Sequence, residues 1–599
     1  MNSFAVHIVS RLAPLLAREP AEIEQFLIFK GDHFCVPLKK LALSAKEMAD
    51  LAAQFRTDPF VASTRVAEPL LIFNLDPLQL LQKVVFDSDV SPSASTGSSA
   101  PPVVFVEVPL PRLGEAFGDD HLRGAVLGAF VAGACRALGI QAKVGGWEMR
   151  RETLRPFVVC ISHAPVSAGM ILIAYERFGS AEALSASPLE HMHDISGQIA
   201  AQLTPELQTK SEERLKRLSD RDPATLAAWT HLYNAWRSAI GQILSHLYLT
   251  NSLKTDELEY GSAAAVSGVL AALEERGMLQ PGRDGKESVV DLTEYKLGRV
   301  RLTHASGAPT PIAAELVAGL RRPGRTYRGS MFSHRHHRSQ FASLLRALRP
   351  DAAVPVPADH PRSLHHGPWV DVPVGNLSDF SDPLALTPIE AFDRARTHME
   401  SMCKDADDVD GRDDGPLPPP AVLSAQVAMS AIAVQLLLRR RTRDVSFDWT
   451  AIVNTQGDVG VYLQYAHARF RRLSTRTLSR CSSNPPLSPH PSIERNTPIR
   501  LPASANLTEL TRSPDALRVA TAMARCSAAV GTAIAELEPS RAVAALIELA
   551  RAVTTATYAL RVKDQPRPVA EARLALFGAA SRELAKGLRV LGLQPLLRM

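Results

Sequence analysis

The chain has 599 residues, of which 46% are hydrophobic and 22% are charged, and its formal net charge at pH 7 is +5. This length excludes a single hydrophobic core and predicts about three or four domains. The composition indicates a soluble globular protein without membrane spans. The net charge is too small for the overall charge alone to identify a nucleic-acid partner. The six cysteines have no paired spacing, which favours reduced thiols in an intracellular protein over disulfides or a zinc site.

Residues 1–87 alternate helical and strand-like patterns, and we expect them to form a small α/β module. The chain begins with an amphipathic pattern that carries two arginines. Because Glu19, Glu22 and Glu24 follow at once, this pattern favours a helix of the module, and a mitochondrial presequence is the alternative. Residues 88–102 are rich in Ser and Pro and are predicted to be a linker.

Residues 103–403 are predicted to form an α/β domain with helical insertions. A strand-like run over 103–108 precedes a loop, and a helical pattern begins near His121. This order is typical of doubly wound nucleotide-binding folds, in which phosphates meet backbone N–H groups at the start of a helix. Further β-rich runs are expected at 157–162 and 170–174, and amphipathic helices at 223–249 and 262–275.

Residues 404–420 are acidic and then proline-rich, and we expect a solvated loop. Its Asp-rich core does not fit an EF-hand, because Ala406 and Leu417 would take the first and twelfth ligand positions. The histidines around His337 lie among arginines without nearby carboxylate or thiol partners, so we expect no metal site.

An apolar helix is predicted over 422–439, within a helical junction over 421–473. It ends in a run of arginines, which are Arg439, Arg440, Arg441 and Arg443. Two interpretations stay open for this run: cations that stabilise the helix C-terminus, or a patch that contacts phosphates. Residues 474–502 are predicted to be a second linker and residues 503–599 a compact helical bundle.

Residues 457–469 read GDVGVYLQYAHAR. This block resembles the Gly-Asp-Thr-Gly-x-Tyr-Leu-Gln-Tyr-x-His-x-Arg block of arginyl-tRNA synthetases, with only the Thr changed, to Val459. The segments 571–599 (EARLALFGAASRELAKGLRVLGLQPLLRM) and 174–180 (AYERFGS) resemble the same family in its eukaryotic, fungal-like form. Weaker matches extend the resemblance almost from end to end.

The resemblance implies an α/β plus all-α protein: a class I synthetase with a Rossmann-like catalytic domain, a small N-terminal module that contacts the tRNA elbow, and a C-terminal helical bundle that binds the anticodon. It implies tRNA as the partner, with a protein partner or an active synthetase as a further candidate, and no membrane. ATP and Mg²⁺ are the expected cofactors if the enzyme is active, and otherwise none. The expected compartment is the cytoplasm, with the mitochondrion as the alternative.

The ATP-binding signature of that family, His-x-Gly-His, is degraded in this chain. The four aligned positions are Gly118, Asp119, Asp120 and His121. An upstream Lys of the family is replaced by Glu115, and an Asn that holds arginine by Arg112. The second family motif, a Lys-bearing loop of the KMSKS type, is expected around residues 371–382, which contain neither Lys nor Arg.

Matching the family motifs residue by residue gives candidate sites. Candidate catalytic residues are His121, as the signature remnant, Glu107 and Glu315. Candidate arginine-binding residues are Glu107, Glu315, His337 and Gln340, and candidate ATP-binding residues are Asp120 and His121. Pro311 replaces the Tyr that lines the arginine pocket in the family. Candidate tRNA-binding residues are Tyr462, Gln464, Tyr465, Arg469, Tyr558, Arg589 and Met599.

Activation of an amino acid by ATP builds negative charge on the phosphates, so it needs cations and N–H donors. Here several such groups are replaced by carboxylates. We therefore predict a family member that acts on tRNA(Arg) in translation, with tRNA binding retained and arginine activation lost or greatly weakened. One alternative is an active arginine–tRNA ligase in which Mg²⁺ bridges the acids to ATP. A structural subunit of a larger assembly is the second alternative.

Overall fold

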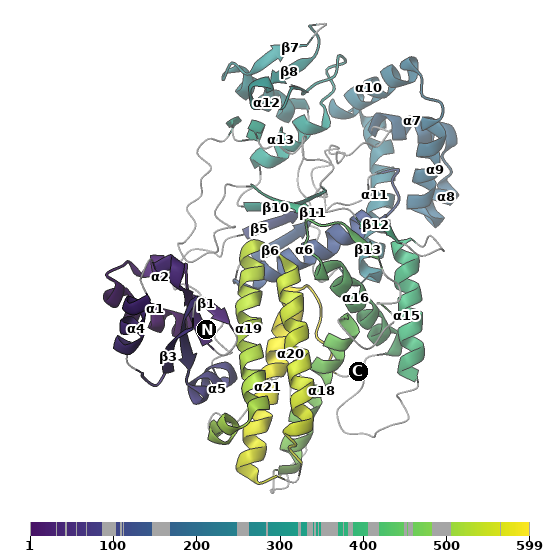
Figure 1. Cartoon of the computed structure of the whole chain (residues 1–599). Helices are drawn as coiled ribbons and strands as arrows, with labels where there is room; N and C mark the ends of the chain where they lie inside the picture. Colours follow the sequence, from purple (N-terminus) through teal and green to yellow (C-terminus); the bar gives the residue numbers. More distant parts are fainter. Residues whose placement is uncertain are drawn as a thin grey trace, which may run out of the picture.

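The structure is a computed structural model with a central sheet, a helical bundle on one side of it and smaller units around them (Figure 1). It describes residues 2–30, 33–41, 45–55, 57–67, 69–86, 103–107, 111, 113–139, 141–145, 168–247, 249, 263–282, 285–321, 325–331, 340, 343–345, 347–348, 369–374, 377–380, 387–404, 419–447, 452, 459–481, 505–563, 565–597 and 599.

The N-terminal module is a four-stranded antiparallel sheet covered by helices. Its strands are β1 (Ile28–Lys30), β2 (His33–Pro37), β3 (Val61–Ala67) and β4 (Leu70–Leu75), in the order β1-β2-β4-β3. The helices are α1 (Asn2–Leu16), α2 (Pro20–Glu24), α3 (Leu38–Leu41), α4 (Ala45–Gln54) and α5 (Pro77–Phe86). Phe4, Ile8 and Leu12 recur every four residues along α1 and are buried, as expected for an amphipathic helix on a sheet.

The central sheet is parallel and has the order β11-β10-β5-β6. Its strands are β5 (Val103–Glu107), β6 (Gln141–Gly145), β10 (Arg325–Met331) and β11 (Trp369–Val374), and α6 (Asp119–Ala137) connects β5 to β6. From the central neighbours β5 and β10, the chain adds the next strand on opposite sides: β6 beyond β5 and β11 beyond β10. In open parallel sheets a ligand binds beyond the carboxyl ends of the strands at such a switch point. The predicted strand, loop and helix therefore lie where a nucleotide site belongs in this fold class.

Two smaller units follow in the chain. The first is helical and comprises α7 (Ala168–Phe178), α8 (Ala181–Ala186), α9 (Pro188–Ala200), α10 (Pro205–Ser219) and α11 (Pro223–His246). The prediction of a β-rich run at 170–174 is wrong, because this run lies in α7 with every side chain buried. A short apolar run without polar interruptions has no period that separates a strand from a buried helix. The run predicted at 157–162 lies outside the described residues.

The second unit has its own hydrophobic core. It contains α12 (Ala263–Glu274), α13 (Pro311–Arg321), the 3-10 helix η2 (Thr293–Tyr295) and a three-stranded antiparallel sheet of β7 (Leu279–Pro281), β8 (Ser288–Asp291) and β9 (Arg299–Arg301). Leu273, Val290 and Leu316 are among its buried residues. Figure 1 shows this unit at the end of the molecule opposite the bundle.

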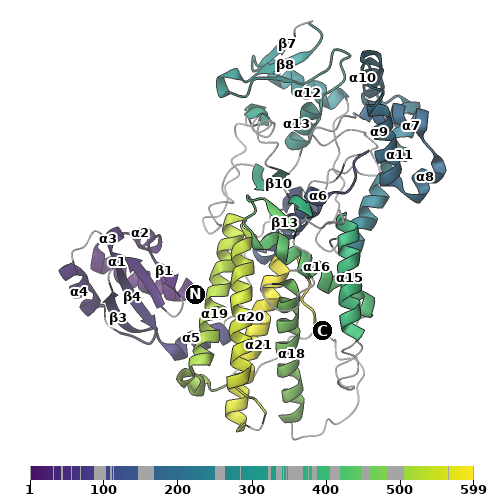
Figure 2. The same cartoon turned by 45° about the vertical axis from the view of Figure 1, so that its right-hand side comes forward.

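The remaining elements form a helical layer and the C-terminal bundle. They are α15 (Pro388–Lys404), α16 (Pro420–Leu438), α18 (Gly460–Cys481), η5 (Leu507–Arg512), α19 (Pro514–Glu536), α20 (Pro539–Ala559) and α21 (Arg567–Val590), with the parallel strand pair β12 (Leu377–Phe380) and β13 (Val445–Phe447). Because α18 continues to Cys481, residues 474–481 are helical and do not belong to the predicted linker. Figure 2 shows the long helices lying side by side.

The expectation that no apolar segment reaches membrane-spanning length needs correction. By length and hydropathy alone, α16 and α20 pass that test among the described residues. However, 72% of the apolar window of α16 is buried inside the protein. A helix that is buried on nearly every side carries apolar side chains all round, as a membrane span does. The length and hydropathy of α16 therefore do not by themselves indicate a membrane helix. The described thiols of Cys35, Cys135 and Cys526 are free and buried.

Close backbone contacts join the units. A Cβ atom on Gly133 of α6 would lie 2.3 Å from the carbonyl oxygen of Val590 in α21, so only glycine allows these helices to approach this closely. The N-terminal module packs on the bundle through α5, which contacts α19 and α21 (Figure 2). There, Arg582 Nη2 donates a hydrogen bond to the carbonyl oxygen of Val85 over 2.9 Å.

Candidate functional site

The start of α6 is the first candidate site. Gly118 is the N-cap residue, in an extended conformation, and Asp119 and Asp120 occupy the first turn. Carboxylates at this position interact favourably with the unpaired N–H groups and the positive end of the helix dipole. The same N–H groups would bind a phosphate in a nucleotide site, so the two aspartates add negative charge where an anion would bind.

His121 stabilises this helix start. Its Nδ1 atom accepts a hydrogen bond from the backbone N–H of Gly118 over 3.0 Å. Its Nε2 atom lies 3.8 Å from Glu115 Oε1, and its ring lies 5.8 Å from that of Phe117. Both ring nitrogens of His121 therefore have neighbours within the chain, one of which is a carboxylate.

Arg123 follows on the same helix turn and is fully buried. Its Nη2 atom donates to the carbonyl oxygens of Arg441 (3.2 Å) and Arg443 (2.7 Å), which lie between α16 and β13. Burial lowers the pKa of the guanidinium, and the nearby acids Asp444, Asp120 and Glu538 oppose that shift. Arg123 lies two residues after the signature, and a sequence pattern gives no sign of partners more than 300 residues away.

The structure places the other predicted active-site residues only in part. Glu107 ends β5 and lies opposite Arg328 of β10 in the strand register. Glu315 lies on α13, which belongs to the second core, whereas β5 belongs to the first. Gln340 donates through Nε2 to the carbonyl oxygen of Leu297 over 2.7 Å, and His337 lies outside the described residues.

The segment predicted to replace the Lys-bearing loop forms strands. Residues 371–374 belong to β11 and residues 377–380 to β12, while Asp382 lies outside the described residues. Within the described part of the chain, no group of three or more His, Cys, Asp or Glu side chains is arranged to hold a metal ion.

The block at 457–469 is the second candidate site, and much of it lies inside the protein. Gln464 is fully buried on α18. Its Nε2 atom donates to Ser430 Oγ (2.9 Å) and to the carbonyl oxygen of Gln594 (3.0 Å), while its Oε1 atom accepts from the N–H of Leu596 (2.9 Å). Gln464 therefore joins α16, α18 and the C-terminal tail. Its role as a tRNA contact stays a prediction that this burial disfavours.

His467 acts beside Gln464 and was not among the predicted site residues. Its Nδ1 atom donates to the carbonyl oxygen of Leu596 over 2.7 Å. Burial, together with the nearby charges of Arg471 and Arg589, lowers the pKa of His467 to about 4, against the opposing effect of the hydrogen bond to Leu596. The only sequence sign of its importance was its place in the block at 457–469. That motif does not distinguish residues that contact the tail from residues that contact RNA.

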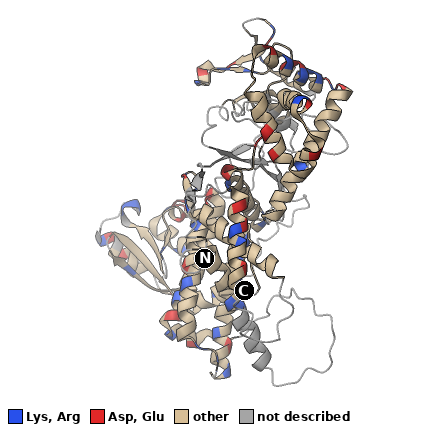
Figure 3. Cartoon of the chain, turned by 90° about the vertical axis from the view of Figure 1, so that its right-hand side faces the viewer, with Lys and Arg blue, Asp and Glu red and all other residues tan. Residues whose placement is uncertain are grey.

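The exposed face of this region holds the other predicted tRNA contacts. Tyr462 Oη lies 3.0 Å from Thr554 Oγ1, which ties α18 to α20. The Arg469 guanidinium lies 5.8 Å from the ring centre of Tyr558, whose side chain is 72% exposed. The remaining three, Tyr465, Arg589 and Met599, are exposed. In Figure 3, Lys and Arg positions, coloured blue on the ribbon, recur along the helices of the bundle.

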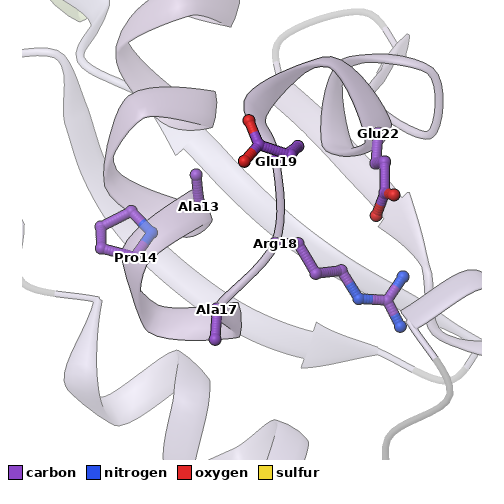
Figure 4. Close-up of a pocket in the computed structure, with 6 residues that line it drawn as sticks. All are labelled: Ala13, Pro14, Ala17, Arg18, Glu19 and Glu22. Carbon is purple, nitrogen blue, oxygen red and sulfur yellow. The ribbon is translucent and has the colours of Figure 1, made fainter.

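A surface hollow lies in the N-terminal module, in a different unit from both candidate sites. Figure 4 shows its lining, in which Arg18, Glu19 and Glu22 surround a small apolar floor. Arg18 Nη1 donates to the carbonyl oxygen of Lys40 over 3.4 Å. The mixture of charges selects no particular ligand, and we assign the hollow no role.

Comparison with known proteins identifies the C-terminal region first. Residues 463–599 match the DALR anticodon binding domain, which here comprises most of α18 and all of α19, α20 and α21. The structure of arginyl-tRNA synthetase from Plasmodium falciparum matches the whole molecule with a TM-score of 0.66, at 12% identity and over 99% of both chains. This likeness confirms the predicted fold class.

Curated relatives align over nearly the whole chain. The probable cytoplasmic arginine–tRNA ligase of Dictyostelium discoideum is 24% identical over 94% of this chain and 94% of its own length. The cytoplasmic arginine–tRNA ligase of Saccharomyces cerevisiae is 24% identical over 95% of this chain and 89% of its own length. The resemblance expected from the sequence is thereby confirmed. The anticodon-binding match, the end-to-end alignments and the shared fold together make this chain similar to arginyl-tRNA synthetases over nearly its whole length.

Proposed function

We propose that this chain acts on tRNA(Arg) in translation as a tRNA-binding member of its family, and that it has lost, or greatly weakened, the activation of arginine by ATP. The observation that carries the proposal is the start of α6. Where the family signature is His-x-Gly-His, this chain has Gly118, two aspartates and a His121 whose Nδ1 atom caps its own helix. The broken positions cluster at the ATP site, while the resemblance elsewhere is retained.

The size of the expected loss follows from the groups that have changed. Removing one donor to a transition-state oxyanion costs about 2.7–4 kcal/mol, or roughly 100- to 1000-fold in rate. Here the first signature His is absent, and Glu115 and Asp120 replace a Lys and a Gly of the family. Carboxylates near phosphates add repulsion of a few kcal/mol when they are partly desolvated. Together these changes predict a rate at least ~1000-fold below that of an intact site.

The other half of the proposal is tRNA binding through the bundle. Its support is the match of residues 463–599 to an anticodon-binding domain, and the half-buried Arg469 beside the exposed ring of Tyr558. An aromatic ring and a guanidinium on one surface suit unpaired bases and phosphates. The cytoplasm is the proposed compartment, with the mitochondrion as the alternative, since relatives of both kinds align with the chain.

An active ligase with an altered ATP site is the second candidate function. It is supported by the retained Glu107 at the carboxyl end of β5 and by the alignment with ligases over nearly the whole chain. This alternative requires ATP with Mg²⁺. It predicts that Asp120→Gly changes activity little and that Glu107→Ala abolishes it.

One assay separates these functions. Purified protein is tested for arginine-dependent exchange of pyrophosphate into ATP, with and without tRNA(Arg), beside an active arginine–tRNA ligase as control. We expect exchange at least ~1000-fold below the control. Exchange at the rate of the control would overturn the loss of activation. A tRNA titration by filter binding, run alongside, would eliminate the proposed tRNA role if no binding occurs at low salt, and would leave a structural subunit as the function.

A further inference from the structure

The connection between α16 and β13 carries exposed arginines that the proposed function has not used. Its sequence from 439 to 444 is RRRTRD. The side chains of Arg439, Arg440 and Arg443 are exposed. Within the described part of the chain, no hydrogen bond or ion pair engages these three side chains. We call them the junction arginines.

The backbone of this connection is held in place from several sides. The N–H of Arg443 donates to the carbonyl oxygen of Arg440 over 2.9 Å, which closes a turn. From one side, buried Arg123 of α6 donates to the carbonyl oxygens of Arg441 and Arg443. The junction arginines are therefore attached to a fixed turn, and a fixed turn loses less conformational entropy when it binds a ligand.

From the other side, Arg441 holds the turn against the bundle. Its Nε atom donates to the carbonyl oxygen of Leu537 over 2.9 Å, and its backbone N–H donates to Glu538 Oε1 over 3.2 Å. Leu537 has a positive φ of 51° and ends α19. The connection thus lies between the start of α6 and the turn from α19 to α20.

The charges of this region divide into two groups. Arg123 and Arg441 are committed to internal contacts, with Asp444 and Glu538 as nearby acids. The side chains of the junction arginines make no such internal contacts within the described part of the chain. Stabilisation of the C-terminus of α16 would explain Arg439, which is its C-cap residue, but that effect falls off within the last turn. Arg440 and Arg443 lie beyond the helix.

We propose that Arg439, Arg440 and Arg443 bind phosphates of the tRNA between its two ends. This inference rests on the proposed function. The connection contacts both the start of α6 and the turn after α19, so a tRNA that lies along this side of the molecule from the bundle to the nucleotide fold passes the junction arginines. Guanidinium groups bind phosphate oxygens through paired N–H donors and read no base sequence. The contact therefore positions the tRNA without selecting it.

The test is a tRNA titration of the full chain over a series of salt concentrations. The variant combines Arg439→Ala, Arg440→Ala and Arg443→Ala. Each lost phosphate contact reduces the slope of log affinity against log salt by about 1, so we expect the slope to fall by up to about 3 and the affinity at low salt to fall by about 10-fold or more. A second variant with Lys at the same three positions keeps the charge, and it should regain most of the lost affinity.

A matched control removes the same charge elsewhere. It combines Arg276→Ala, Arg299→Ala and Arg301→Ala, which are exposed arginines of the second unit. The control should change the affinity less than twofold. If the junction variant binds like the control while wild type binds tRNA, this proposal is wrong and the proposed function stands. If wild-type protein binds no tRNA at low salt, both are wrong. Circular dichroism of the variants shows whether each is folded.

Discussion

The start of α6 and the contact between α18 and the C-terminal tail both derive from motifs of one family, yet they use their polar groups differently. At the start of α6, Glu115, Asp120 and His121 are partly exposed and belong to one short segment. At the tail, Gln464 and His467 are buried and bond residues about 130 positions away. The residues of the first site differ from the family signature, whereas those of the second are fixed by packing.

This difference explains why the block at 457–469 keeps the family pattern. A buried amide with three hydrogen-bond partners accepts no substitute without leaving a partner unsatisfied, which costs about 1–3 kcal/mol for each group. Asp120, by contrast, is partly exposed. A motif can therefore be retained because the fold requires it as well as because the function does.

The largest expected effect comes from Gly460. A Cβ atom there would lie 2.0 Å from the carbonyl oxygen of Ser430, in the backbone of α16. Gly460→Ala should therefore lower the free energy of unfolding by about 3 kcal/mol, measured by urea denaturation. Gly531→Ala is the control, because no atom lies within 4 Å of the added Cβ, and it should stabilise the protein by about 0.5–1 kcal/mol. Equal effects of both changes would contradict a packing constraint on the block.

Arg123→Met tests whether a residue near the start of α6 stabilises the fold. The change leaves the carbonyl oxygens of Arg441 and Arg443 without their donor and should cost about 3 kcal/mol of unfolding free energy. The control is Arg136→Met, on the exposed face of the same helix, with an expected effect within about 0.5 kcal/mol. A loss below 1 kcal/mol for the Arg123 variant would show that the junction does not depend on this contact.

The buried imidazole of His467 predicts a pH dependence. Its folded-state pKa of about 4 lies below the ordinary value of 6.5, so its contribution is complete above pH 6.5 and is lost as the pH falls toward 4. From pH 7 to pH 5 the wild type should lose about 2 kcal/mol more unfolding free energy than His467→Asn, whose amide keeps a donor for the tail. Identical losses in both proteins would contradict the burial of a neutral imidazole.

The smallest effect on the fold is expected at Tyr558. Its side chain is 72% exposed, so Tyr558→Ala should change the unfolding free energy by less than about 0.5 kcal/mol. If the ring stacks on a base, tRNA affinity should fall by about 1–3 kcal/mol, measured by filter binding. Tyr295→Ala, which removes a 66% exposed ring from the second unit, serves as the control and should leave affinity unchanged. An unchanged affinity for the Tyr558 variant would remove this residue from the tRNA site.

Local patterns predicted the elements that have a clear period or a flanking loop. The strand β5, the helix α6 after its loop, the apolar α16 and the C-terminal helices all lie close to their expected positions. The helix α7 was predicted as a strand, because five consecutive apolar residues carry no period.

The predictions were weaker for residues whose partners are distant in sequence. Arg123 lies in the first turns of α6, but its hydrogen bonds reach the connection after α16. Gln464 was assigned to tRNA, although its amide bonds Ser430 and the tail. These contacts follow from how the units dock, and a pattern of neighbouring residues contains no information about docking.

The close approach of α6 and α21 at Gly133 also has a consequence for the order in which the molecule can be completed. Helix α6 emerges early during synthesis, whereas Val590 lies near the end of the chain. At roughly 5–20 residues per second, the interval on a ribosome is on the order of half a minute or more. Until α21 arrives, the face of α6 that packs against it in the finished protein stays uncovered by that helix. A stop codon that removes α21 would leave the distant central sheet with an unprotected helix.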